Sequence, residues 1–356
     1  MKKLTTFIIF FLIIIFGIIY FTYGKDFLER LDEKRVYSVK DTVETAMDNL
    51  EECKFFGGGI ITYNNKKVIF LDYNNTTKWK NEDAEFTSQI FTAGDYIFRK
   101  SGSTIQVTDK NNERYVIAEI DGQIINVSRE NNKTYIIIKN SAGKNSLYII
   151  NENNEIAVDN KVFSDIITGV SISDKSEGYS IMTLKLEGGK TVNSIYFNLM
   201  DDVELWKTEI SNEILIKIKI VNNNVVVIGT KNIYYYNLNG KLMWKNGIYN
   251  EILDYEINKE NQKIYVLYKK SDGCELIFYN LEGKVKDLME IPGGAQKLKV
   301  YGNKVFVYNE NRIYLIHGTK TDKVYENNEN KIVDFMSSGN DLFILFKDKL
   351  IKGQIK

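Results

Sequence analysis

From about residue 50 onward, short runs of β-branched and aromatic residues alternate with clusters of Asn, Gly, Asp and Lys. Residues 214–221 (ILIKIKIV) alternate Ile with Lys, which is typical of a strand with one buried face. Residues 225–228 are uniformly apolar, as in a strand that is covered on both faces. Residues 232–236 (NIYYY) follow, then an Asn-Gly hairpin signal and residues 241–244 (KLMW). This stretch therefore predicts four strands within about 35 residues.

The same order of runs recurs eight times along the chain. The third apolar run of each copy ends at a polar residue or glycine: Asn74, Asp109, Asn151, Asn198, Asn237, Asn280, His317 and Gly353. Consecutive markers lie 35–47 residues apart, a spacing typical of four-stranded propeller blades. No helical pattern interrupts the copies, which argues against a parallel α/β fold. We therefore predict an all-β protein, a β-propeller of eight four-stranded blades, with seven blades as the alternative.

Closure of such a ring makes a further prediction about the ends of the repeat region. The sequence stops at Lys356, just after the third run of the eighth copy, so the fourth strand of that blade must come from elsewhere. The candidate is the segment before the first copy, residues 36–40 (VYSVK). Pairing this segment with the last strand would close the circle and remove an exposed sheet edge.

The beginning of the chain has a different pattern. Residues 7–21 are Phe, Ile or Leu at every position except Gly17 and Tyr20. Residues 4–23 together give a stretch of the length that crosses a bilayer core, about 20 residues. The run predicts a membrane anchor. A cleaved signal peptide is the alternative, although the run is longer than the roughly 7–15 apolar residues of such a signal.

The chain thus divides into three parts. We expect residues 1–24 to form a cytoplasmic start and one transmembrane helix, residues 25–35 a charged stalk, and residues 36–356 the propeller. Two lysines before the apolar run favour a cytoplasmic N-terminus. Four basic residues after it argue the other way: Lys25, Arg30, Lys34 and Arg35. Because large domains translocate largely regardless of charge, we predict a single-pass protein of the cell membrane with an extracytoplasmic propeller.

Composition narrows the classes of function only slightly. Lys and Arg balance Asp and Glu at 47 each, so net charge gives no indication of a nucleic-acid partner. Hydrophobic residues make up 44% and aromatic residues 13% of the chain, enough for a substantial core. The two cysteines, Cys53 and Cys274, lie far apart in sequence. They predict two free and mostly buried thiols, with no disulfide framework and no cysteine metal site.

Three predicted fourth strands carry tryptophan followed by lysine, at Trp79, Trp206 and Trp244. This is similar to the tryptophan-bearing repeat of PQQ-like β-propellers, which commonly have eight blades. The layout also resembles an uncharacterised family of membrane-anchored propellers from Gram-positive bacteria. Quinoprotein dehydrogenases of this fold use an adjacent cysteine pair, which Cys53 and Cys274 are not, so the resemblance implies no quinone cofactor. We expect the three tryptophans to pack neighbouring blades together.

Residues that could carry chemistry are few. His317 is the only histidine, which excludes multi-histidine zinc sites, and it is predicted to be an ordinary residue where a strand meets a turn. Residues 56–59 (FGGG) precede a strand and not a helix, unlike a phosphate-binding loop. Residues 109–113 (DKNNE) have alternating oxygen donors but lack the glycine and distal glutamate of a calcium loop, so a hairpin turn is predicted.

The paired carboxylates at residues 51–52 and 201–202 are adjacent only in sequence, whereas a catalytic pair is defined by its separation across a cleft. We therefore predict no catalytic, cofactor or metal-binding residue. The function expected is a non-enzymatic binding or scaffold protein of the cell envelope with a protein, peptide or glycan partner. The alternatives are a glycan-active enzyme with acidic residues at the propeller channel, and an extracellular sensor that depends on a partner. An acidic cluster in a deep pocket would favour the enzyme, and an Asn/Lys/Tyr-lined face would favour binding.

Overall fold

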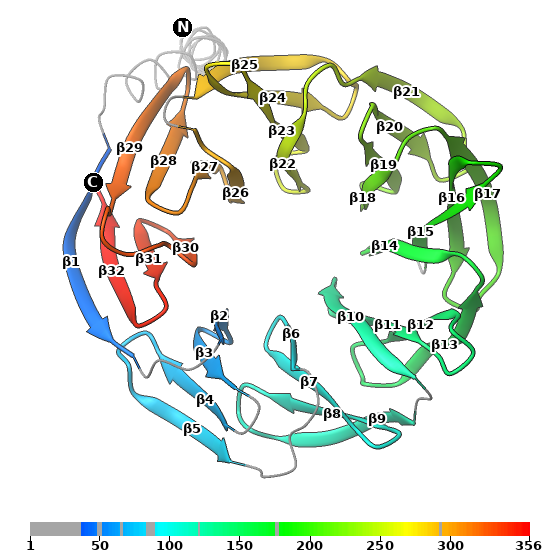
Figure 1. Cartoon of the computed structure of the whole chain (residues 1–356), viewed down its shortest axis with the longest axis horizontal. Coiled ribbons are helices and arrows are strands. Elements are labelled where there is room, and N and C mark those ends of the chain that lie inside the picture. The colour runs from blue at the N-terminus through cyan, green and yellow to red at the C-terminus, as the bar shows by residue number, and fades with distance from the viewer. Residues whose placement is uncertain are drawn as a thin grey trace, which may run out of the picture.

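The computed structural model describes residues 37–47, 52–64, 67–82, 90–119, 122–174, 178–291 and 294–356. The predicted membrane segment, residues 1–24, and the predicted stalk, residues 25–35, lie outside these ranges. Within them, no helix is both long and apolar enough to cross a membrane. The described residues form strands that assemble into eight antiparallel sheets of four strands each, arranged in a ring (Figure 1). The prediction of eight four-stranded blades is confirmed.

The blades are numbered in chain order. Blade 1 contains β2 (Glu52–Phe56), β3 (Gly59–Tyr63), β4 (Lys67–Asp72) and β5 (Thr77–Glu82). Blade 2 contains β6 (Phe91–Ala93), β7 (Tyr96–Ser101), β8 (Thr104–Asp109) and β9 (Arg114–Glu119). Blade 3 contains β10 (Gln123–Glu130), β11 (Lys133–Lys139), β12 (Asn145–Ile150) and β13 (Ile156–Phe163). Blade 4 contains β14 (Ile166–Ile172), β15 (Gly178–Glu187), β16 (Lys190–Leu199) and β17 (Glu204–Ser211).

The second half of the ring continues in the same order. Blade 5 contains β18 (Leu215–Val221), β19 (Asn224–Gly229), β20 (Asn232–Asn237) and β21 (Leu242–Gly247). Blade 6 contains β22 (Ile252–Asn258), β23 (Lys263–Lys270), β24 (Gly273–Asn280) and β25 (Val285–Ile291). Blade 7 contains β26 (Lys297–Tyr301), β27 (Lys304–Tyr308), β28 (Arg312–His317) and β29 (Lys320–Glu326). Blade 8 contains β30 (Asp334–Ser338), β31 (Asp341–Leu345), β32 (Lys349–Ile355) and, as its outer strand, β1 (Val39–Ala46).

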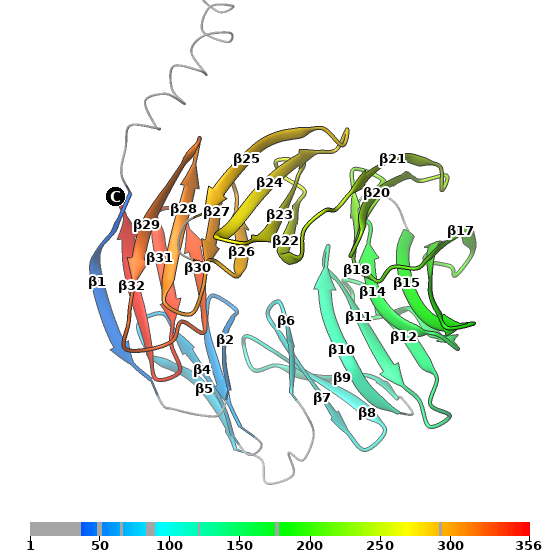
Figure 2. The ribbon, with the colours of Figure 1, turned by 45° about the horizontal axis from the view of Figure 1, so that its top comes forward.

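Blade 8 closes the ring as expected, with one difference in position. β1 pairs antiparallel with β32, from Val39 opposite Ile355 to Ala46 opposite Lys349 (Figure 2). Ser38 and Lys356 exchange two backbone hydrogen bonds of 3.0 Å just before the strand. The donated strand therefore begins later than the predicted residues 36–40 and runs further. The motif VYSVK supplies the apolar anchors of the contact, since Tyr37 and Val39 pack against the cluster between blades 7 and 8.

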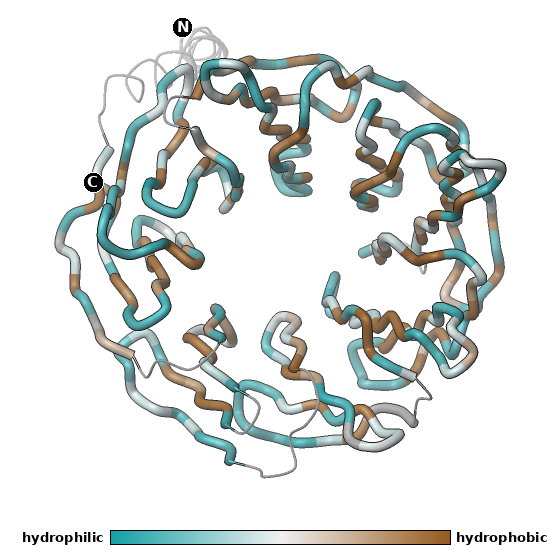
Figure 3. Tube along the Cα trace, viewed as in Figure 1, coloured by the Kyte–Doolittle hydropathy of each residue, from teal (hydrophilic) through white to brown (hydrophobic). Residues whose placement is uncertain are grey.

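Each sheet buries both of its faces against its neighbours. The strand β19 is an example: Val225, Val226, Val227 and Ile228 are all fully buried, because two alternate residues face blade 4 and the other two face blade 6. In Figure 3 the apolar segments gather on the strands within the ring wall, and the turns are mostly hydrophilic. The uniformly apolar run in the sequence is thus a strand covered on both faces, as predicted.

Two faces of the ring are distinguished by their turns. The turns between the first and second strands and between the third and fourth strands lie on one face, together with Tyr37 and Lys356. We call it the terminal face. The turns between the second and third strands, and the connections from blade to blade, lie on the opposite face. The first strand of every blade lines the central channel (Figure 1).

The three tryptophans connect blades 1, 4 and 5 to the blades that follow them, as expected. The indole Nε1 atoms of Trp79, Trp206 and Trp244 donate 2.8 Å hydrogen bonds to the carbonyls of Lys110, Leu238 and Leu281. All three acceptors lie in the turn between the third and fourth strands of the following blade. Trp206 and Trp244 also stack on Phe197 and Tyr235 of their own blades. These rings therefore have a structural role between and within blades.

The packing of Trp206 against the turn of the next blade can be tested at Gly240. Gly240 has φ +76°, and a Cβ there would lie 2.8 Å from Cγ of Trp206. Gly240→Ala should destabilise the protein by about 2–3 kcal/mol, because backbone strain adds to a clash with the indole. Gly188→Ala is the matched control, since Gly188 has φ +57° and open space around the same position. Urea unfolding of both variants checks this; equal losses would show that the contact with Trp206 is unimportant.

Candidate binding surfaces

The terminal face carries an open groove of about 1080 Å³ across blades 6, 7 and 8. Its polar lining comes mainly from the turns of these blades: Asn261, Lys263, Asn303, Lys304, Asn340 and Lys356. Among the described residues, Asp287 is the one acidic side chain in the lining. Lys304 joins two blades, because its Nζ donates to the carbonyl of Gly339 at 2.5 Å and to Oδ1 of Asn340 at 3.1 Å. Burial lowers the pKa of this lysine.

The first described residue lies in this groove. The backbone N–H of Tyr37 donates a 2.8 Å hydrogen bond to Oδ2 of Asp322, and the same oxygen lies 2.7 Å from Nε2 of His317. The ring of Tyr37 packs edge-on against His317, with 4.8 Å between centroids. His317 does end a strand at a turn, as predicted, but it is buried (8% exposed) and not an ordinary surface residue. It helps to hold the incoming chain on blade 7.

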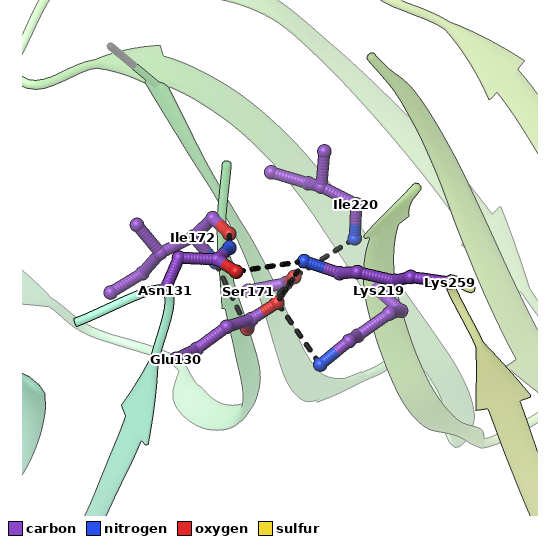
Figure 4. Close-up of polar contacts among 7 residues, drawn as sticks. All are labelled: Glu130, Asn131, Ser171, Ile172, Lys219, Ile220 and Lys259. Carbon is purple, nitrogen blue, oxygen red and sulfur yellow. Dashed lines mark hydrogen bonds and ion pairs between the residues drawn. The ribbon is translucent and has the colours of Figure 1, made fainter. Parts of the chain in front are cut away.

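A buried carboxylate, Glu130, lies in the central channel at blade 3, across the channel from the groove (Figure 4). Glu130, at the end of β10, lies 3.0 Å from Nζ of Lys219 and 3.2 Å from Nζ of Lys259. Its oxygens also accept hydrogen bonds of 3.1 Å from the Ser171 hydroxyl and the Ile172 backbone N–H. The five groups come from blades 3, 4, 5 and 6, so one side chain connects four blades.

Further hydrogen bonds complete this network. The Ser171 hydroxyl oxygen accepts a 2.8 Å bond from the Ile220 backbone N–H. Asn131 donates to the Ile172 carbonyl at 2.6 Å and accepts from Lys259 at 3.2 Å. Both oxygens of Glu130 thus already have polar partners, two lysines on Oε1 and the Ile172 N–H on Oε2. The arrangement indicates a structural connection and not a catalytic acid.

Other acidic residues of the channel are also held by the protein. Asp254 on β22 accepts hydrogen bonds from the backbone N–H groups of Leu298 (2.7 Å) and Tyr255 (2.9 Å), and burial raises its pKa. Burial likewise raises the pKa of Glu256, two residues further along the strand. Asp334 on β30 pairs with Lys299 of blade 7. In the described ranges, no three His, Cys, Asp or Glu side chains converge as metal ligands would.

The opposite face exposes large apolar side chains over blades 4, 5 and 6. Tyr249, in the connection from β21 to β22, is 94% exposed, and Leu186, at the end of β15, is 79% exposed. Ile166 and Ile214 are also exposed on this face. Exposed apolar groups that gather on one face are typical of a protein interaction surface.

The remaining candidates from the sequence have structural roles. Gly57 and Gly58 form the β2–β3 hairpin turn, with φ +54° and +80°. Oδ1 of Asp109 accepts from the backbone N–H groups of Asn111 (2.9 Å) and Glu113 (2.8 Å), so residues 109–113 form the predicted hairpin turn. Asp202 accepts from the Tyr179 hydroxyl at 2.7 Å. Glu51 lies outside the described residues.

The cysteines are free, as the sequence predicted. Cys274 is buried, and burial raises the pKa of Cys53 to about 11. Both thiols therefore remain protonated at neutral pH and are weak nucleophiles.

Together, the four-stranded blades, the channel and the closing strand define the class: an eight-bladed β-propeller. Solved structures agree on this fold, and at 10% identity they show the fold alone. BamB from Moraxella catarrhalis matches with a TM-score of 0.55, over 89% of this chain and 99% of that chain. Saccharomyces cerevisiae Sqt1 matches with a TM-score of 0.59, over 90% and 100%. Porphyromonas gingivalis dipeptidyl peptidase 4 also matches with 0.59, over 84% of this chain and 56% of that longer chain.

The chain belongs to the family described as "Family of unknown function (DUF5711)", which matches residues 30–353. No curated protein matches the chain. The expected eight-bladed propeller fold and the expected family without an assigned function are confirmed.

Proposed function

We propose that the protein is a membrane-anchored scaffold of the cell envelope, which binds a protein partner through the opposite face of an extracytoplasmic propeller. The observation that carries this proposal is the position of Tyr37 in the groove of the terminal face. A membrane helix within residues 1–24 would hold this face toward the bilayer. Residues 24–36 reach at most about 45 Å even when fully extended. This short tether limits how far the propeller can move away from the membrane.

The other face is then directed outward, and it carries Tyr249 and Leu186. Aromatic and large aliphatic residues are the usual anchors of protein interfaces. The groove supports binding and not hydrolysis, because Asn and Lys dominate its polar lining and Asp287 has no second carboxylate beside it there.

A glycan-active enzyme is the second candidate. It is favoured by the raised pKa values of Asp254 and Glu256, which lie two residues apart on the same channel-facing strand. It is disfavoured by the two backbone N–H groups that already occupy the oxygens of Asp254. Asp254→Asn should therefore affect stability and not a glycan-cleaving activity.

The anchor can be tested directly on intact cells. Protease treatment should remove the propeller while leaving a membrane-embedded N-terminal fragment, and alkaline extraction should leave the full chain in the membrane pellet. Recovery of the propeller in the soluble extract, or complete protection from protease, would contradict the proposed topology.

The partner surface can be tested by photo-crosslinking in the membrane. A photoreactive amino acid at Tyr249 should give an adduct of one defined mass, and the same residue at Val116 should give none. Val116 is a matched control, since it is also an exposed apolar residue (59%) but lies on the outer strand β9. Equal adducts at both positions, or none at Tyr249, would argue against a partner on the opposite face.

A further inference from the structure

The two halves of the terminal face differ in charge, and the half around Tyr37 has an excess of lysines. Five lysines gather there on blades 6, 7 and 8: Lys263, Lys286, Lys304, Lys320 and Lys356. We infer that this cationic sector docks on an anionic lipid leaflet and that its groove receives phosphate headgroups. The inference rests on the proposed membrane anchor and specifies which part of the propeller contacts the bilayer.

The acidic groups within the sector offset part of this positive charge. Glu282 pairs with Lys284 at 3.2 Å, and Asp322 accepts a hydrogen bond from the Tyr37 N–H and lies beside His317. Asp341 lies 3.9 Å from Lys352, and Glu260, Asp287 and Asp322 remain against the five lysines, so the sector keeps a positive excess. Lys286 and Lys320 are exposed, so their ammonium groups are free to approach a surface.

The other half of the terminal face, over blades 2, 3 and 4, carries more acidic than basic side chains, although Lys110 (paired with Asp95) and Lys133 also lie there. Its turns expose six acidic residues: Glu113, Glu152, Glu155, Asp174, Asp201 and Asp202. Among these, Asp202 is paired with Lys161 at 2.5 Å. The cationic and acidic halves lie across the channel from each other, because blades 2–4 and blades 6–8 occupy opposite arcs of the ring (Figure 1).

An anionic membrane surface would therefore tilt the propeller, with blades 6–8 toward the lipid. Lysines within about 8–10 Å of the leaflet are attracted, since that is the screening length at physiological salt, and the acidic half is repelled. Tyr37 lies in the cationic half, so the tether draws the same half toward the membrane. Blades 6–8 then rest on the headgroups, blades 2–4 are raised, and lysine ammonium groups bind lipid phosphates in the groove.

The test uses the full chain inserted in lipid nanodiscs that carry a headgroup-attached quencher. A fluorophore is placed through Asn303→Cys in the cationic half, or through Asn153→Cys in the acidic half. Selective labelling is possible because Cys53 and Cys274 are weakly reactive thiols. In discs with about 30 mol% phosphatidylglycerol, quenching at position 303 should exceed that at position 153 several-fold. The difference should disappear in about 0.5 M salt and in phosphatidylcholine discs.

Two charge-reversal variants serve as a matched pair. The triple change Lys263→Glu, Lys286→Glu and Lys320→Glu should abolish the anion-dependent quenching. The triple change Lys144→Glu, Lys190→Glu and Lys347→Glu alters net charge equally on the opposite face and should leave the quenching intact.

Three outcomes would overturn the docking. The first is equal quenching at both positions, and the second is quenching that does not depend on anionic lipid. The third is a fluorescence change at position 303 that occurs only after a membrane protein extract is added, which would identify a protein as the occupant. Failure of the chain to insert in the discs would instead remove the anchor and both proposals with it. Insertion without anion-dependent quenching overturns only the docking.

Discussion

Deleting residues 1–46 should prevent the propeller from folding cooperatively, whereas deleting residues 1–36 should leave a soluble and stable ring. The shorter deletion keeps Tyr37 and β1. The longer one removes the outer strand of blade 8, its pairing from Val39 to Ala46 with β32, and the Tyr37 contacts with Asp322 and His317. The lost apolar burial and ladder hydrogen bonds amount to on the order of 5 kcal/mol or more.

The physical reason is that β1 covers an edge as well as adding contacts. Without it, β32 exposes its backbone N–H and C=O groups, which form a template for pairing with other chains. Gel filtration and urea unfolding of the two truncated proteins check the prediction. The longer deletion should elute as aggregates or unfold at a much lower urea concentration. Closely similar midpoints would mean that blade 8 is stable with three strands.

Glu130→Ala should cost about 2–3 kcal/mol of stability. Removing one partner of a buried ion pair leaves uncompensated charge and costs about 3–5 kcal/mol when both partners are fully buried. The Glu130 side chain is only 10% exposed, but Lys219 and Lys259 are 25% and 23% exposed, so water in the channel offsets part of that loss. The hydroxyl of Ser171 and the N–H of Ile172 also lose their acceptor.

Glu152→Ala is the control for this substitution, since Glu152 lies in the same blade but is exposed, and its loss should cost less than about 0.5 kcal/mol. Urea unfolding should show a lower midpoint for Glu130→Ala with an unchanged slope. Lys259→Met should have an intermediate effect, because Lys219 still pairs with Glu130. If Glu130→Ala and Glu152→Ala behave alike, the four blades do not depend on the network.

The local pattern of apolar and polar residues was sufficient to predict many of the strands and turns. The alternation in residues 214–221 places Leu215, Ile218 and Ile220 in the core, and the apolar run at residues 225–228 is a fully buried strand. The Asn-Gly signal gives the turn at Gly240. Strand period and turn chemistry depend on neighbours in sequence, so the sequence alone determined the order and approximate ends of the blades, and the structure decided between eight and seven.

The candidate surfaces could not be derived in the same way. Glu130 and Lys259 are far apart in sequence, and no spacing rule relates them. His317 was interpreted as a loop residue, because its partner Tyr37 arrives from the other end of the chain. The only available signal was the closing strand itself, since it brings residues before Val39 to the turns of blades 7 and 8.

The sequence by itself therefore determined an all-β repeat of four-stranded units, an apolar N-terminal segment and the absence of recognised catalytic motifs. The tertiary structure alone decided where β1 pairs, which lysines neutralise Glu130, and that Tyr37 lies among the turns of blades 6–8. The reason is geometric. Strand formation depends on side chains a few residues apart, whereas contacts across the channel and around the groove depend on how eight sheets curve into a closed ring.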